Sequence, residues 1–247
     1  MYTYEMNAGY SVMDASLRMT VPAILDCFQD AAIFEAENGR ITVDYLYSRH
    51  LAWLLSSWQI VIGRRPKLNE RIKIATAPYD FKGFLGYRNF VMNGEDGAVI
   101  VRAASIWTLV DTQKGCPVRP TQEMQDGYEL APKLEMEYAP RKIALFGDGE
   151  ERAHFKIRRY QIDSNQHMNN VEYVRLAMEV LPQDAAIREL RAEYKKAARC
   201  GDEVTAAAVE AEGRHQVVLS DTEGGVYAVV EFSTQDSANV AGAADKS

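Results

Sequence analysis

The sequence predicts an α+β protein in which one helix followed by several antiparallel strands occurs twice along the chain. Each half has one segment whose apolar residues recur at helical spacing. Each such segment precedes a series of short runs that are rich in aliphatic and aromatic residues. Turn-forming residues separate these runs in both halves, so hairpins are expected to join the strands.

The composition is typical of a globular protein with an apolar interior, with 247 residues, 47% of them hydrophobic and 26% charged. A formal net charge of -7 argues against nucleic-acid binding driven by overall charge. No apolar run approaches the ~20 residues that span a bilayer, and the N-terminus lacks a leader pattern, so we expect a cytoplasmic protein without membrane association. The cysteines are too scattered for a disulfide framework or a zinc site, and we expect no metal or cofactor. They are Cys27, Cys116 and Cys200.

The first half opens with an extended segment, and a helix follows it. Its predicted N-cap is Thr20, Pro22 is tolerated in the first turn, and Gly39 is a suitable stop. Four strand-like runs follow, and a turn-rich stretch at residues 93–97 precedes the last of them. The runs cover residues 51–62, 71–76, 84–92 and 98–110.

The second half repeats this order. An extended segment at residues 155–160 leads to a helix whose apolar face runs from Val171 to Leu181. Four strand-like runs follow at residues 191–197, 203–209, 215–220 and 226–234.

Composition also suggests the domain boundaries. The first unit is predicted to cover residues 1–131 and the second residues 151–235. Between them, residues 132–150 are rich in Pro and Gly and are interpreted as a linker. Residues 236–247 are small and polar without periodicity, and are predicted to form a flexible tail.

One helix followed by four or five antiparallel strands is typical of a sheet that wraps around a helix, the hotdog arrangement. A single unit leaves a sheet edge and a groove uncovered, whereas two units side by side can pair edges and enclose an apolar channel. The sequence therefore predicts a double hotdog that forms an internal pseudo-dimer, and it leaves a homodimer of whole chains open. The alternative is the weak self-similarity that short β-rich stretches always show.

A dense polar segment lies directly before the second helix. Asn169 can cap this helix, and Glu172 could close a capping box. In an extended stretch, Asp163, Asn165 and His167 would project to one side. An acid, an amide and an imidazole would then converge beside a helix N-terminus, whose partial positive charge suits a developing oxyanion. These three residues are our candidate catalytic group.

The first half has no equivalent imidazole. When the halves are aligned, Asp14 stands opposite Asp163, while Ser16 and Arg18 stand opposite the amide and the imidazole. The first copy keeps the acid and the cap Thr20 but cannot perform the same proton chemistry. We therefore expect one chemical site in the chain.

The motif Asp-x-Asn-x-His-x-Asn-Asn at residues 163–170, followed by Val171 and Tyr173, resembles the acyl-acyl-carrier-protein thioesterases of plants and bacteria. This resemblance implies a double-hotdog hydrolase that ends fatty-acid elongation by releasing a long-chain free acid from acyl carrier protein. The similar stretches cover nearly the whole chain. The others are residues 65–70, 86–90, 103–107, 193–196 and 201–202.

The resemblance also implies roles for the polar residues. Asp163 would orient or activate, Asn165 would bind the thioester or the water, and His167 would transfer protons. Asn169 and Asn170 would contribute to substrate binding.

An acidic carrier also needs a basic surface. Arg158 and Arg159 are the basic pair nearest to the candidate catalytic segment, so we assign them to substrate binding. The alternative is that such a pair is simply a solvated edge.

One position departs from the family pattern. A Glu usually follows the Tyr-basic-basic strand as a further catalytic group, but Ala197 stands there in this chain. Three explanations are open: Asp163 or His167 alone prepares the water, another carboxylate such as Glu193 replaces the missing one, or turnover is slow.

Other functions remain open at this point. The same site would serve an acyl-CoA thioesterase, a dehydratase acting on 3-hydroxyacyl chains, or an acyl-binding protein without activity. Ser164 lacks the G-x-S-x-G context of a nucleophile, and nothing in the sequence places Cys200 near His167.

Overall fold

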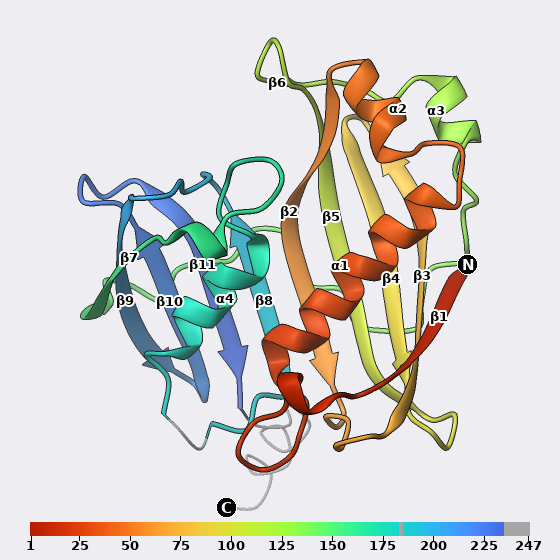
Figure 1. Ribbon diagram of the computed structural model, residues 1–247. Coiled ribbons are helices and arrows are strands. Elements are labelled where there is room, and N and C mark those ends of the chain that lie inside the picture. Colours follow the sequence, from red (N-terminus) through yellow and green to blue (C-terminus); the bar gives the residue numbers. More distant parts are fainter. Residues whose placement is uncertain (183–184, 235–247) are drawn as a thin grey trace, which may run out of the picture. The chain divides into compact units, whose positions relative to one another are not determined.

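The computed structural model describes residues 1–182 and 185–234 and divides the chain into two compact units, Met1–Ala139 and Pro140–Ser247 (Figure 1). The predicted tail at residues 236–247 lies outside the described residues. None of the described helices is long and apolar enough to cross a bilayer.

The first unit contains one antiparallel sheet with the strand order β1-β3-β4-β5-β2, and β6 pairs with β5. The strand predicted at residues 51–62 is found with those bounds. The strand predicted at residues 71–76 continues to Lys82, through Pro78 and a register shift between Pro78 and Asp80. Proline is tolerated there because β1 pairs only with the preceding part of the strand. The strands are β1 (Tyr2–Asn7), β2 (Leu51–Ile62), β3 (Arg71–Lys82), β4 (Leu85–Asn93), β5 (Val99–Asp111) and β6 (Cys116–Pro117).

Helix α1 (Val21–Glu37) lies along one face of this sheet (Figure 1). It begins as predicted at Thr20, whose Oγ1 accepts the backbone N–H of Ala23 at 3.3 Å. Phe28 is fully buried on its inner face, with ring centroids 5.2 Å from Phe90 and 6.3 Å from Trp58. This aromatic cluster anchors the helix to the sheet.

Two short helices of the first unit were not predicted. They are α2 (Val43–Ser48) and α3 (Gln122–Asp126), and each begins at a threonine N-cap. Both are too short to show a helical period in the sequence. A small apolar cluster of Ile41, Leu109 and Met124 packs beside them.

The second unit repeats the plan with the strand order β7-β9-β10-β11-β8. Helix α4 (Asn170–Met178) packs against β10 and β11. It ends at Met178, so Leu181, predicted on its apolar face, lies in the following turn. The strands are β7 (Glu150–Lys156), β8 (Glu189–Tyr194), β9 (Glu203–Ala211), β10 (Arg214–Ser220) and β11 (Val226–Ser233).

The predicted linker at residues 132–150 is divided between the units at Ala139 and Pro140. Its first part binds two buried side chains of the first sheet. Asn89 Oδ1 accepts the Tyr138 hydroxyl at 2.9 Å, and Gln59 accepts the Ala139 N–H at 2.8 Å. These contacts make the segment up to Ala139 part of the first unit's fold.

The second part of the linker binds the second sheet in a similar way. Gln216 is fully buried; its amide accepts the Phe146 N–H at 3.1 Å and donates to the Ala144 carbonyl at 2.9 Å. The amide side chain thereby pairs with backbone groups of the linker through one acceptor and one donor, as a peptide group would.

Candidate functional site

Residues Asp163 to Met168 form a tight turn rather than the extended stretch predicted from the sequence. The Asp163 N–H donates to the His167 carbonyl at 2.8 Å, and the Gln166 N–H donates to the Asp163 carbonyl at 3.1 Å. Gln166 has a φ of 62°, which reverses the chain direction. The candidate residues are thus brought together by a fold-back of the backbone, and the alternation argument was wrong for this segment.

The carboxylate of Asp163 holds this turn. Its Oδ1 accepts the backbone N–H groups of Asn165 at 2.8 Å and His167 at 3.3 Å. Within the described ranges, neither its Oδ2 nor the imidazole of His167 has a hydrogen-bond partner. The carboxylate therefore orders the backbone that carries His167 and does not orient the imidazole by direct contact.

The N-terminus of α4 follows at once. Asn169 Oδ1 accepts the Val171 N–H at 2.9 Å and caps the helix as predicted. The capping box was a wrong prediction, because the Asn169 N–H donates to the Gln161 carbonyl at 2.8 Å. The carboxylate of Glu172 instead contacts the side chains of Gln161, at 3.2 Å, and Arg175, at 2.9 Å.

A second loop, residues 195–202, lies beside the turn. The Met168 N–H donates to the Ala198 carbonyl, and the Ala198 N–H donates to the Tyr173 hydroxyl, both at 2.8 Å. Burial, with the nearby charges of Asp163 and Asp202 among further causes, raises the pKa of Tyr173 to about 12, so its hydroxyl stays protonated. Ala198 and its neighbour Ala197 are therefore held next to the turn.

Tyr194 supplies a further attachment at the end of β8. Its hydroxyl donates to the Asn170 carbonyl at 3.0 Å, and its ring stands edge-on to that of Tyr173 at 5.6 Å. The strand predicted to reach Ala197 ends at Tyr194, because the next residues turn toward the start of α4.

The same turn occurs in the first unit, as the internal alignment predicts. Asp14 Oδ1 accepts the N–H groups of Ser16 at 2.8 Å and Arg18 at 3.2 Å, and Leu17 has a φ of 55°. Here the second carboxylate oxygen is occupied, because Arg65 donates to it at 2.5 Å. Although partial burial opposes it, the hydrogen bonds from Ser16 and Arg65 hold the pKa of Asp14 well below its usual range.

Glu193 does not replace the missing glutamate. The Tyr194 side chain faces α4, and Glu193, next to it in the strand, faces the opposite side of the sheet. Glu193 is buried there and accepts the Ile143 N–H at 3.0 Å from the linker. Its role is to bind the linker.

The basic residues predicted to bind the carrier are exposed. Arg158 and Arg159 precede the turn, and within the described part of the chain neither guanidinium has a hydrogen-bond or ion-pair partner. Ser164 and Cys200 are also exposed, and no hydrogen bond joins the Cys200 thiol to His167 among the described residues. No group of three or more His, Cys, Asp or Glu side chains suited to a metal ion occurs there either.

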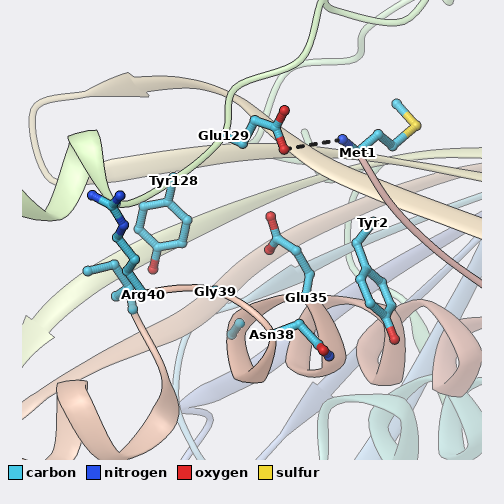
Figure 2. A pocket seen from close by; sticks show the side chains of 11 residues that line it. Met1, Tyr2, Glu35, Asn38, Gly39, Arg40, Tyr128 and Glu129 are labelled. Carbon is cyan, nitrogen blue, oxygen red and sulfur yellow. Dashed lines mark ion pairs between the residues drawn. The ribbon is translucent and has the colours of Figure 1, made fainter.

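A pocket of about 300 Å³ lies in the first unit and contains none of the predicted site residues (Figure 2). Its walls include Glu35 and Tyr128, and the terminal amine of Met1 lies 3.9 Å from Glu129 at its edge. Glu35 is paired with the buried Arg88 at 2.7 Å, so its charge is already neutralised.

Sequence reasoning missed two residues that shape the paired turns, Tyr173 in the second unit and Arg65 in the first. Tyr173 was noted as part of a motif, and Arg65 as part of a similar stretch, but neither was given its contact. Aligning the loops after β2 and β8 would have placed Arg65 opposite Ala197. It would also have placed both residues beside the aspartate of their own turn, Asp14 or Asp163.

Two family models match the chain. The model described as acyl-ACP thioesterase N-terminal domain matches residues 1–128, and that of the C-terminal domain matches residues 147–234. Oleoyl-acyl carrier protein thioesterase 2, chloroplastic, of Arabidopsis thaliana is 27% identical over 67% of this chain and 50% of its own length. Thioesterase 1 of the same plant is 25% identical over 83% of this chain and 63% of its own length. The chain thus spans half to under two thirds of these relatives.

Solved structures show the same fold. An acyl-ACP thioesterase from Bacteroides thetaiotaomicron has a TM-score of 0.87 at 21% identity, covering 94% of this chain and 97% of its own. The 12:0-ACP thioesterase from Umbellularia californica has a TM-score of 0.80 at 16% identity, covering 94% and 96%. The predicted α+β class with two hotdog units is confirmed.

Proposed function

Because the chain belongs to the acyl-ACP thioesterase family, we propose that it hydrolyses long-chain acyl-acyl-carrier-protein to a free fatty acid and carrier thiol, ending elongation. The observation that carries the proposal is the turn before α4. It presents the His167 imidazole and one oxygen of Asp163, and both lack a partner among the described residues.

The reaction needs three things that this turn can supply. Water must be made nucleophilic, the tetrahedral oxyanion must be stabilised, and the departing thiolate must receive a proton. Imidazole is the side chain whose charge changes nearest neutral pH, so His167 is suited to give that proton to sulfur.

The oxyanion has two candidate stabilisers. The Asn165 side chain is exposed on the turn, while its backbone N–H is held by Asp163, so its amide is available to donate to the thioester oxygen. The N-terminus of α4 begins three residues after His167 and contributes its partial positive charge.

The carrier is proposed to dock on the exposed residues before the turn. Arg158 and Arg159 offer two guanidinium groups that form no ion pair within the described residues. An acidic carrier would be attracted to this basic pair on a chain whose net charge is -7.

Thiol release from acyl-carrier-protein and acyl-CoA substrates of several chain lengths tests the function. Faster release from the carrier substrates supports the proposal, and faster release from CoA supports the acyl-CoA thioesterase alternative. His167→Ala is expected to lower kcat by ~10²–10⁴-fold with an unchanged melting temperature. Acyl chains that stay bound without any thiol release would instead indicate an acyl-binding protein, the alternative that the absence of the family's Glu at Ala197 raised.

A further inference from the structure

The two units carry the same pair of loops around their turns. In the first unit the Lys67 N–H donates to the Glu70 carboxylate at 2.9 Å, and in the second the Arg199 N–H donates to the Asp202 carboxylate at 2.9 Å. The preceding carbonyl accepts the N–H of a turn methionine in both units. The Pro66 carbonyl accepts from Met19 at 2.9 Å, and the Ala198 carbonyl accepts from Met168 at 2.8 Å. The two loops are therefore equivalent residue by residue.

This equivalence places Ala197 where the first unit has Arg65. The Arg65 guanidinium binds Asp14 Oδ2 at 2.5 Å and the Met19 carbonyl at 3.3 Å. A side chain at this position thus reaches the second oxygen of the turn aspartate. In the second unit the side chain is a single methyl group, and Asp163 Oδ2 has no partner among the described residues.

Neighbouring cations of the second unit do not take the place of Arg65. Lys196 binds the Asp221 carboxylate at 2.6 Å, and Lys195 lies 3.9 Å from Glu193, which faces away from α4. Arg199 is exposed and makes no side-chain hydrogen bond or ion pair in the described ranges.

We propose that Asp163 Oδ2 binds the attacking water and takes its proton, and that Ala197 makes this possible by leaving the position of Arg65 open. This inference rests on the proposed function and deepens it. In the first unit, Arg65 neutralises the carboxylate of Asp14. In the second unit, which also carries His167, the carboxylate of Asp163 stays available. The chain then needs no second carboxylate to activate water.

The reaction balances with these two residues. The water oxygen attacks the thioester carbonyl carbon while one water proton passes to Asp163 Oδ2. The oxyanion collapses, the C–S bond breaks, and protonated His167 gives its proton to sulfur. The proton on Asp163 then returns to His167 through solvent, and the products are a carboxylic acid and a thiol.

Asp163→Asn separates this role from that of a turn former. Asparagine keeps an oxygen for the N–H groups of Asn165 and His167 and replaces Oδ2 with an NH₂ group. If His167 alone were the base that activates water, activity would survive this substitution, because the carboxylate of Asp163 does not touch the imidazole. We expect kcat to fall by ~10²–10⁴-fold with little change in KM or melting temperature. Wild-type kcat in this variant would overturn the inference.

Ala197→Arg tests the open position. The arginine should pair with Asp163 as Arg65 does with Asp14, and kcat should fall as far as in Asp163→Asn. Ala197→Gln is the control of similar length without charge, and it should keep most of the activity. Full activity in the arginine variant, or equal loss in the glutamine variant, would contradict the proposal.

The first unit supplies the matched control. Arg65→Gln frees Asp14 but should leave kcat unchanged, because that unit has Arg18 in place of the imidazole. Side-chain carboxyl NMR at neutral pH gives a readout independent of turnover: Ala197→Arg should shift the Asp163 carboxyl resonance, because the new guanidinium would bind Oδ2. If the wild type releases no thiol, the proposed function is wrong. If it releases thiol and the Asp163 resonance does not move in Ala197→Arg, only the present inference is wrong.

Discussion

The Tyr173 hydroxyl accepts the backbone N–H of Ala198 at 2.8 Å and so joins the inner face of α4 to the loop that carries Ala197. Ala198 and Tyr173 are both buried, so this N–H has no access to water as a substitute partner. The contact holds the loop after β8 against the catalytic turn.

Tyr173→Phe should therefore destabilise the protein by ~1–3 kcal/mol, because it leaves a buried N–H without an acceptor. Urea unfolding measures the change. Tyr194→Phe is the matched control. Loss of the Tyr194 hydroxyl removes a donor from the Asn170 carbonyl and leaves no buried N–H unsatisfied. Equal decreases in the free energy of unfolding in the two variants would show that the hydrogen bond to Ala198 contributes no more than an ordinary tyrosine hydroxyl contact.

Charge reversal at Arg158 and Arg159 should weaken carrier recognition. We expect the double glutamate variant to raise KM for acyl-carrier-protein roughly 10-fold at low salt, with kcat and the KM for acyl-CoA little changed. The difference should shrink as ionic strength rises. Arg102→Glu, at an exposed position of β5, is the control. An equal rise in KM for acyl-CoA would exclude a carrier-specific role.

Gln216→Leu should release the second part of the linker. It removes the acceptor of the Phe146 N–H and the donor to the Ala144 carbonyl, at a cost of roughly 2–4 kcal/mol. Limited proteolysis should then cut near residues 143–146. Gln59→Leu should instead expose residues 137–139, and cleavage at the same place in both variants would refute the assignment of the two parts.

Lowering the pH should reduce the stability of the folded protein, because Glu70 becomes protonated. The hydrogen bonds from Arg64, at 2.7 and 2.9 Å, lower the pKa of Glu70 from 4.5 to about 2, against the opposing effect of burial. A pKa depressed in the folded state means that this stability is present above about pH 4.5 and is lost as the pH falls toward 2. The melting temperatures of wild type and Glu70→Gln should converge over this range. A constant difference from pH 7 to pH 2 would contradict the linkage.

Much of the fold could be predicted from the sequence because its elements are long and periodic. Thr20 marks the start of α1, and β2 has the predicted bounds. The extension of β3 was hidden by Pro78, which reads as a strand breaker unless the neighbouring strand is known to stop short. The internal repeat was visible because both units use the same order of elements.

The candidate site could be located from the sequence but not built from it. The motif identified Asp163, Asn165 and His167, yet the positive φ of Gln166 that folds them into a turn has no signal in a non-glycine residue. Long-range partners such as Tyr173 and Ala198 depend on how the loop after β8 returns to the helix. The roles of the site residues, the carrier as partner and the cytoplasmic location stay predictions.

The split of the linker at Ala139 gives a rule for recombining this protein with its relatives. A chimera joined between Ala139 and Pro140 lets each half inherit the segment that its own sheet already binds. A junction at residue 131, where composition alone would place it, would separate Asn89 and Gln59 from the backbone groups they recognise. Two buried amide side chains therefore decide where the halves of related proteins can be exchanged. The position of the Pro- and Gly-rich linker does not decide it.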